Sequence, residues 1–189
     1  YDEAMRRFGS DKPDMRFGME LADVDDVAKG NGVGVFDTAE SVVSINVTGG
    51  NKYTRKELDA FTDWVKRPQI GALGLIYCRV NEDGSYKSSV DKFFDQEKLA
   101  QWAEKSGSKA NDLILVLSGK AEKVRKQMNE LRLHIGDLEG LRPKDKFAAC
   151  WVVDFPLVEY DEESDRWHAM HHPFTSTIPA DRDKMDTDP

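Results

Sequence analysis

Three histidines near the end of the sequence, His168, His171 and His172, have the residue type and spacing for chemistry. They follow an acidic segment, 161–165, and zinc accepts imidazole together with carboxylate ligands. We predict a strand here, however, and adjacent side chains on a strand point to opposite faces, so His171 and His172 cannot share one small ion. The pattern favours no metal site, with one imidazole facing a polar pocket and the other packed behind it. A small metal-dependent hydrolase built on these histidines is the alternative.

A glycine-rich segment, Gly30-Asn31-Gly32-Val33-Gly34, invites comparison with phosphate-binding loops. A dinucleotide-binding loop needs a strand before it and a helix that begins at its last glycine. Here the residues predict a turn and then a short strand over Gly32–Phe36. The pattern therefore favours a turn with close strand packing over a phosphate site.

The longest amphipathic pattern covers 121–135, where apolar residues recur at intervals of three and four and predict a helix. Its basic positions are Lys120, Lys123, Arg125, Lys126 and Arg132. Because Glu122 and Glu130 interleave with them, a solvated face is favoured, and contact with RNA phosphates is the alternative. His134, near the end of this helix, is interpreted as a cap on the last carbonyl groups.

The two cysteines, Cys78 and Cys150, each lie in an apolar run, which is typical of buried thiols in a reducing compartment. No stretch of apolar residues is long enough for a membrane-spanning helix, and no apolar stretch follows the first residues as in a signal peptide. A cytoplasmic location is therefore expected. The net charge of −8, from 27 basic and 35 acidic residues, excludes a basic footprint over the whole chain and argues against DNA as a partner.

The order of strand and helix patterns predicts an α+β fold of two layers, with helices packed on a small mixed or antiparallel sheet. Strands are expected over Gly32–Phe36, Ser41–Val47, 71–80 and Leu113–Leu117, the third as a central strand buried on both faces. Helices are expected over 2–8 and 121–135 and after two N-terminal caps. Thr54 with Glu57 has the spacing of a capping box, and Asp95 is the other cap. After Phe147 the alternation of strand and helix patterns ends, and residues 157–174 predict a hairpin with the acidic segment at its tip.

Two strings in this sequence resemble bacterial-type aspartyl-tRNA synthetases, which are class II enzymes. The first is Phe8-Gly9-Ser10-Asp11-Lys12-Pro13-Asp14-Met15-Arg16. The second is Trp151-Val152-Val153-Asp154-Phe155-Pro156, followed by Ala169-Met170-His171-His172-Pro173-Phe174-Thr175-Ser176. In that family the strings flank an inserted GAD domain. The resemblance therefore implies an insertion domain over 17–147, flanked by strips of antiparallel catalytic core over 1–16 and 148–189.

The resemblance also implies an activity for the parent protein. Such an enzyme activates L-aspartate with ATP and Mg²⁺, transfers the aspartyl group to tRNA, and works as a homodimer in the cytoplasm. By motif match, His171 is implied as an L-aspartate-binding residue and His172 as a neighbour that lines the same site. The match assigns no catalytic residue and no metal ligand, and it gives no role to Asp11 or Asp14.

The departures from the family pattern limit what this sequence is expected to do alone. It contains neither the arginine-centred second signature motif nor the third, so the ATP-binding arginines are expected elsewhere and the chain by itself is expected to be inactive. It begins at Tyr1 rather than Met, as an excised piece would, and has Thr177 where the family usually has Pro. The alternative is a GAD-type tRNA-contacting module of a tRNA-dependent amidotransferase. Such a module has no reason to carry the His171-His172 string.

Overall fold

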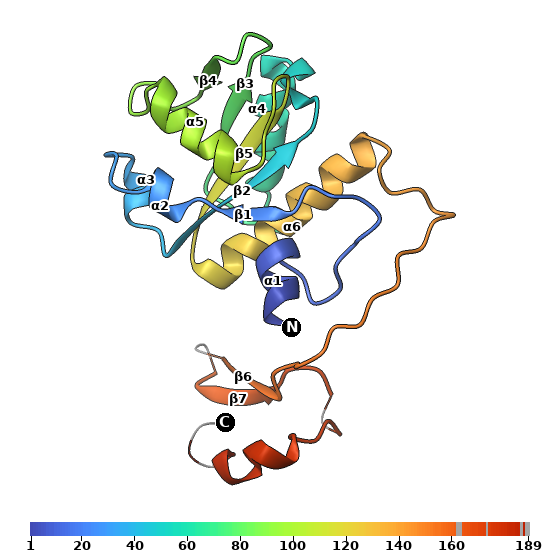
Figure 1. Ribbon diagram of the computed structural model, residues 1–189. Coiled ribbons are helices and arrows are strands. Elements are labelled where there is room, and N and C mark those ends of the chain that lie inside the picture. The colour runs from blue at the N-terminus through green and yellow to red at the C-terminus, as the bar shows by residue number, and fades with distance from the viewer. Residues whose placement is uncertain (162–163, 173, 186, 188–189) are drawn as a thin grey trace. The chain divides into compact units, whose positions relative to one another are not determined.

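The computed structural model describes residues 1–161, 164–172, 174–185 and 187. The chain divides into two compact units. The larger unit comprises Asp2–Ala149, and the smaller comprises Cys150–Pro189 together with Tyr1. We describe each unit by itself (Figure 1).

The larger unit is built on a five-stranded sheet in the order β1-β2-β5-β3-β4. The strands are β1 (Leu21–Asp23), β2 (Ser41–Val47), β3 (Ile76–Val80), β4 (Tyr86–Ser88) and β5 (Leu113–Gly119). Every pairing in this sheet is antiparallel, and the longest joins β2 to β5. The expected α+β class with an antiparallel sheet is confirmed, although the short strands β1 and β4 were not predicted.

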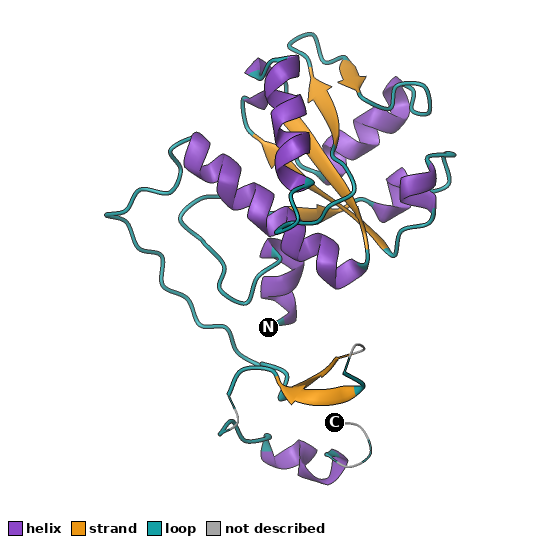
Figure 2. Cartoon of the chain, turned by 180° about the vertical axis from the view of Figure 1, so that it is seen from behind, coloured by secondary structure: helices purple, strands orange, loops and turns teal. Residues whose placement is uncertain are grey.

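Helices cover both faces of this sheet (Figure 2). The helices of the unit are α1 (Asp2–Phe8), α2 (Asp25–Ala28), α3 (Gly34–Asp37), α4 (Arg55–Val65), α5 (Gln96–Lys105) and α6 (Ala121–Leu138), with a 3₁₀ turn, η1, at Gly50–Lys52. Because side chains alternate along a strand, β2 and β5 send one set of apolar residues under α4 and α6 and the other set under α2, α3 and α5. The unit therefore has three layers where the sequence analysis expected two.

Two of the helices begin at the caps that the sequence predicted. The Thr54 side chain accepts the Glu57 backbone N–H and the Glu57 carboxylate accepts the Thr54 N–H, which is a complete capping box for α4. Asp95 accepts the Lys98 backbone N–H at 2.9 Å and so caps α5. Both caps pair backbone donors that the first turn of a helix leaves without partners.

The strand predicted over Gly32–Phe36 is wrong, because residues Gly34–Asp37 form helix α3. The Asp37 carboxylate accepts the backbone N–H groups of Gly30 at 2.7 Å and Gly32 at 3.1 Å, which turns the chain back on itself. Both glycines have positive φ, as this turn requires. The donors that a phosphate would need are thus bound to a carboxylate of the chain itself.

The apolar run over 71–80 is also only partly a strand. Pairing begins at Ile76, and Leu73 is 85% exposed in the preceding loop. Strand β3 lies next to the edge strand β4, and only Cys78 and Val80 along it are buried. The prediction of a central strand buried on both faces is therefore wrong for 71–75 and too strong for the remainder.

The described residues of the smaller unit form a two-stranded hairpin and one 3₁₀ helix. Strands β6 (Val158–Asp161) and β7 (Arg166–Ala169) pair antiparallel, and η2 covers Pro179–Lys184. The predicted hairpin is confirmed but ends earlier than expected, while Glu162 and Glu163 of the acidic tip lie outside the described residues. No residue described between 150 and 187 is buried, so Cys150 is exposed, contrary to prediction, whereas Cys78 is buried as expected.

Candidate functional site

The β6–β7 hairpin positions the two histidines that the sequence analysis singled out. The Met170 backbone N–H donates to the Leu157 carbonyl at 3.1 Å, so the pairing continues just beyond β7 before the chain bends at His171. His171 and His172 therefore lie in a bend rather than on the strand that the sequence predicted. Both side chains are exposed.

The two imidazoles have different neighbours. The His171 ring lies against Phe155, with ring centroids 5.3 Å apart. His172 Nδ1 accepts the Phe174 backbone N–H at 3.1 Å, and the two rings lie edge to face at 4.9 Å. Because Nδ1 of His172 is an acceptor, the proton of its neutral form is on Nε2. Pro173, between them in the string, lies outside the described residues.

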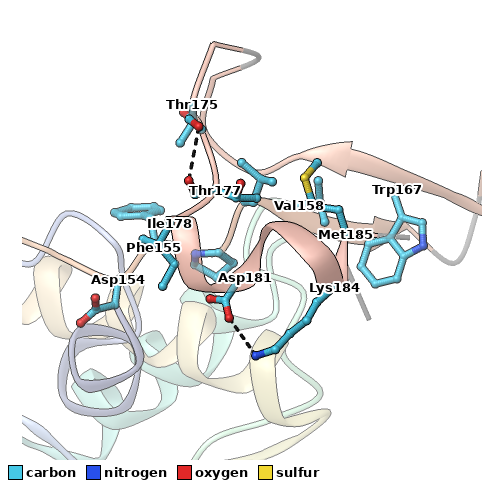
Figure 3. Close-up of a pocket in the computed structure, with 13 residues that line it drawn as sticks. Asp154, Phe155, Val158, Trp167, Thr175, Thr177, Ile178, Asp181, Lys184 and Met185 are labelled. Atoms are coloured by element: carbon cyan, nitrogen blue, oxygen red, sulfur yellow. Dashed lines mark hydrogen bonds and ion pairs between the residues drawn. The ribbon is translucent and has the colours of Figure 1, made fainter. Parts of the chain in front are cut away.

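A hollow of about 790 Å³ lies between the start of the hairpin and η2 (Figure 3). Its lining includes Phe155, Trp167 and Ile178 together with Asp181 and Lys184, whose side chains form an ion pair at 2.8 Å. Neither His171 nor His172 is among the lining residues; His171 contacts the wall through Phe155. The hollow thus combines apolar walls with polar groups, as small-molecule sites do.

The third histidine, His168, faces the hairpin tip. Its Nε2 lies 3.0 Å from Ser164 Oγ and 3.9 Å from Asp161 Oδ2. Within the part of the chain that the structure describes, no three His, Cys, Asp or Glu residues are placed to hold one metal ion. The geometry gives no support to the metal-dependent hydrolase alternative.

A second site, in the larger unit, surrounds the first string of the resemblance. Arg132, predicted on a solvated face, is fully buried, so that prediction is wrong. Its Nη2 donates to the carbonyls of Asp14 (2.8 Å), Phe17 (3.1 Å) and Gly18 (2.8 Å), and its Nε donates to that of Met19 (2.9 Å). Its guanidinium carbon lies 4.0 Å from the Phe17 ring centroid, a cation–π contact. Burial lowers the pKa of Arg132 to about 10, and the side chain stays charged at neutral pH.

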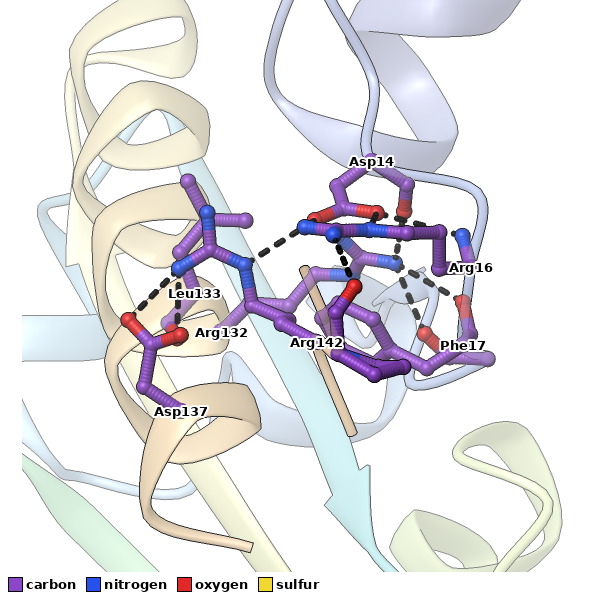
Figure 4. Close-up of polar contacts among 9 residues, drawn as sticks. Asp14, Arg16, Phe17, Arg132, Leu133, Asp137 and Arg142 are labelled. Carbon is purple, nitrogen blue, oxygen red and sulfur yellow. Dashed lines mark hydrogen bonds and ion pairs between the residues drawn. The ribbon is translucent and has the colours of Figure 1, made fainter. Parts of the chain in front are cut away.

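Asp14 joins this string to the segment that follows α6 (Figure 4). Its carboxylate accepts Nε and Nη2 of Arg16, at 2.9 and 2.7 Å, and Nε of Arg142, at 2.9 Å. Hydrogen bonds from Arg16, and secondarily from Arg142, hold the pKa of Asp14 far below its usual range. Arg16 Nη1 also donates to the Pro143 carbonyl at 2.7 Å, so the two segments are bound together directly.

Two further residues of the predicted basic face have partners within the chain. Arg125 donates to Asp23 and to the Arg6 carbonyl, and Lys126 pairs with Glu122 on the same helix. These pairs break up the cationic face that contact with RNA phosphates would need.

His134 does not cap helix α6. Its ring stacks on Trp64, with centroids 4.4 Å apart and planes 4° from parallel, and meets Phe61 edge to face. The sequence interpretation is therefore wrong, because the aromatic residues of α4 lie beside the end of α6. Burial, helped by the charge of Arg67, lowers the pKa of His134.

A known protein family matches the central part of this chain. The GAD domain family matches residues 34–128, a range that begins at α3 and ends within α6. The chain belongs to the GAD domain family. No helix in the described residues is both long and apolar enough to cross a membrane.

Similarity to curated proteins extends beyond the GAD domain to the whole chain. The aspartate–tRNA ligase of Flavobacterium psychrophilum is 55% identical over 189 residues, and that of Bacteroides fragilis is 55% identical over 190. The aspartate–tRNA ligase of Parabacteroides distasonis is 54% identical over 190 residues. Each alignment covers 100% of this chain and 32% of the relative, so the chain spans about a third of the length of the curated relatives it matches. The resemblance to bacterial aspartyl-tRNA synthetases with a GAD domain is confirmed.

Proposed function

We propose that this chain is the GAD-containing part of an aspartate–tRNA ligase, which activates L-aspartate with ATP and transfers the aspartyl group to tRNA. The observation that carries the proposal is the extent of the similarity. About 55% identity covers the GAD domain and also both flanking strings, including the His171-His172 pair. A tRNA-contacting module of an amidotransferase would account for the GAD match alone.

Residues 17–147 form the insertion in this proposal, with residues 1–16 and 148–189 as strips of the catalytic core. The exposed aromatic residues of the smaller unit support the assignment of 148–189 to the catalytic core. Trp151 is 94% exposed and Phe174 is 90% exposed, and no described residue from 150 onward is buried. Large aromatic residues without a core of their own are typical of a segment that packs against other parts of a protein.

In the complete enzyme, His171 binds the side-chain carboxylate of L-aspartate and His172 lines the same site. Exposure of both rings, and the contact of His171 with Phe155 at the wall of the hollow, support this assignment. A carboxylate bound beside an imidazole favours the protonated ring, which donates from both nitrogens. Asparagine lacks that charge, so the imidazolium favours aspartate over asparagine.

ATP and Mg²⁺ are held by residues outside this sequence in this proposal. No described group of three acidic, histidine or cysteine residues is placed for a metal ion, so we assign no step to either here. The proposed partners of the complete protein are tRNA, L-aspartate and ATP, with a second copy of itself as a homodimer in the cytoplasm.

The proposal is tested by aspartate-dependent pyrophosphate exchange and by charging of tRNA, both measured with the complete protein to which this sequence belongs. We expect exchange that requires L-aspartate and is not supported by L-asparagine. The chain of 189 residues alone is expected to give no exchange, because it lacks the arginines that stabilise charge at the reacting phosphate. Amidation of a mischarged tRNA without any exchange would overturn the proposal in favour of the amidotransferase module.

A further inference from the structure

The cluster around Asp14 joins two segments that are far apart in sequence. One is 14–19, where the chain passes from the first string into strand β1, and the other is 140–143, where it leaves α6. Arg142 reaches back to Asp137 on the last turn of α6 at 2.6 Å while its Nε donates to Asp14. Arg16 closes the connection through the Pro143 carbonyl.

Close packing confirms that these segments are fitted to each other and to α6. A Cβ added at Gly136 on α6 would lie 2.8 Å from Cζ of Phe17 and 3.1 Å from Cδ of Arg142. A Cβ at Gly9 would lie 2.1 Å from the Arg125 carbonyl oxygen, so the first string also approaches the backbone of the same helix. Neither glycine position leaves room for a side chain.

The chemistry of Arg132 is poorly suited to a role in stability alone. It is 0% exposed, and its Nη1 has no hydrogen-bond partner among the described residues. An unsatisfied buried donor is costly, and an apolar residue of similar volume often stabilises a core equally well. The guanidinium differs from such a residue in one respect. It fixes the positions of four backbone carbonyls at once, and with them the path of residues 14–19.

We propose that Arg132 and Arg142 are positioning residues for the ligase reaction. Together with Asp14 they hold residues 14–19 in one conformation against the segment that leaves α6. This fixes the direction of the adjoining string Phe8–Pro13, which belongs to the catalytic-core strip. The inference rests on the proposed function, and neither arginine is expected to touch substrate.

The test uses the complete protein carrying Arg132→Met, with Arg79→Met as the matched control. Arg79 also donates to backbone carbonyls, those of Asn51 and Tyr53, but lies on β3, away from the cluster. Unfolding midpoints, the kcat and KM for aspartate in pyrophosphate exchange, and the rate of tryptic cleavage after Arg16 are measured for each protein. Arg142→Met, at a partly exposed position, serves as the second variant if Arg132→Met does not fold.

We expect Arg132→Met to lower kcat at least tenfold and to speed cleavage after Arg16, since small displacements near a reaction can cost about 10²-fold in rate. Arg79→Met should lower the unfolding midpoint but leave kcat and the rate of cleavage after Arg16 as in the wild-type protein. Arg132→Lys keeps the charge but not the planar fork, so it should not restore kcat. Wild-type kcat in both cluster variants, or an equal loss in Arg79→Met, would overturn the inference. Absence of exchange in the wild-type protein would refute the proposed function instead. Unchanged cleavage after Arg16 in Arg132→Met and Arg142→Met would show that these arginines do not hold residues 14–19, and would refute the inference whatever the exchange result.

Discussion

The two units of this chain differ in where their apolar side chains lie. In 2–149, both faces of the sheet are covered, and Trp102, Phe36 and Leu115 are completely buried. In 150–189, the aromatic side chains of Trp151, Trp167 and Phe174 are each at least half exposed. The first unit has the core that an independent domain needs, whereas the second consists of a hairpin and a turn of helix without one.

The residues that stabilise the fold and the residues proposed to bind substrate therefore lie in different parts of the sequence. The residues proposed to bind aspartate lie in the unit without a core, so their final arrangement depends on the remainder of the protein. The larger unit has a core of its own, and the Asp14 cluster joins its segments 14–19 and 140–143. Core substitutions in the larger unit, away from the Asp14 cluster, should therefore act on folding, and substitutions of the proposed aspartate-binding residues should act on activity.

The largest effect is expected from separating the units. Residues 2–149 expressed alone should unfold in one cooperative transition, because their core is complete. Residues 150–189 alone should show no transition, because an isolated two-stranded hairpin is marginal at best in water. Circular dichroism during heating measures both, and a cooperative transition in 150–189 would contradict the comparison.

A shorter chain of 17–147 sharpens the same test. It should also fold, but with a lower midpoint than 2–149. The truncation removes Phe8, whose ring centroid lies 5.1 Å from the Arg132 guanidinium carbon. It also removes Asp14, whose carbonyl accepts Arg132 and whose carboxylate accepts Arg142. Equal midpoints would show that residues 2–16 add nothing to the larger unit.

Replacing a tryptophan with alanine should affect the free energy of unfolding strongly in the larger unit and hardly at all in the smaller one. Trp102→Ala removes a side chain that packs on Phe36 and Phe94 and should cost about 3–5 kcal/mol in the free energy of unfolding. In the chain of 189 residues, Trp151→Ala, at a position that is 94% exposed, should change it by less than about 0.5 kcal/mol. Urea denaturation measures both values, and similar losses would mean that the smaller unit has a core after all.

In the complete protein, His171→Ala should lower kcat/KM for aspartate at least tenfold, equivalent to about 1.4 kcal/mol. The KM for ATP should change much less, because the lost interaction is with the aspartate carboxylate. His172→Ala should have a smaller effect, and His168→Ala, on the same hairpin beside Ser164, serves as the control with unchanged kinetics. Normal aspartate kinetics in a folded His171→Ala protein would refute its proposed role.

Loss of a helix cap, unlike loss of His171, should affect stability and leave the kinetics unchanged. Thr54→Ala removes the side-chain acceptor for the Glu57 N–H and should cost about 1 kcal/mol of stability in residues 2–149. Thr54→Ser retains the hydroxyl and should restore most of it. In the complete protein, neither change should alter aspartate kinetics.

The smallest effect concerns pH. His134 is the only histidine in residues 2–149, and its pKa is lowered in the folded state by burial. The unfolded chain, with a pKa of about 6.5, then binds the proton first as the pH falls. Stability should be complete above about pH 6.5 and decline below it. The urea midpoint at several pH values measures this, and His134→Gln should flatten the profile between about pH 7 and 5.5.

Local patterns predicted much of the fold. The capping box at Thr54, the cap at Asp95 and strands β2 and β5 depend on nearby residues or on simple periodicity, and each is confirmed. The errors arise where a partner distant in sequence or an unexpected turn decides the structure. The turn before α3 is closed by the Asp37 carboxylate, and Arg132 is buried because the chain more than one hundred positions earlier wraps around it.

The candidate site was predictable only in part. The His171-His172 pair came from a resemblance between strings, and the structure adds its neighbours, such as Phe155, but no ligand. The arginine cluster was missed because its residues look like an ordinary surface pattern when read along the helix. One signal was present, since Arg16 and Asp14 lie at the end of the first string, but nothing in the spacing linked them to position 142.

The hydrogen bond from Arg16 to the Pro143 carbonyl spans 127 positions of sequence with one side chain. If residues 17–147 are inserted into a catalytic core as proposed, this bond holds together the two places where the chain enters and leaves the insertion. Ends that are held close together lower the entropy cost of joining them, because that cost grows with the length of the closing loop. The proposed insertion would then keep its two ends in place through its own side chains, without help from the protein that contains it.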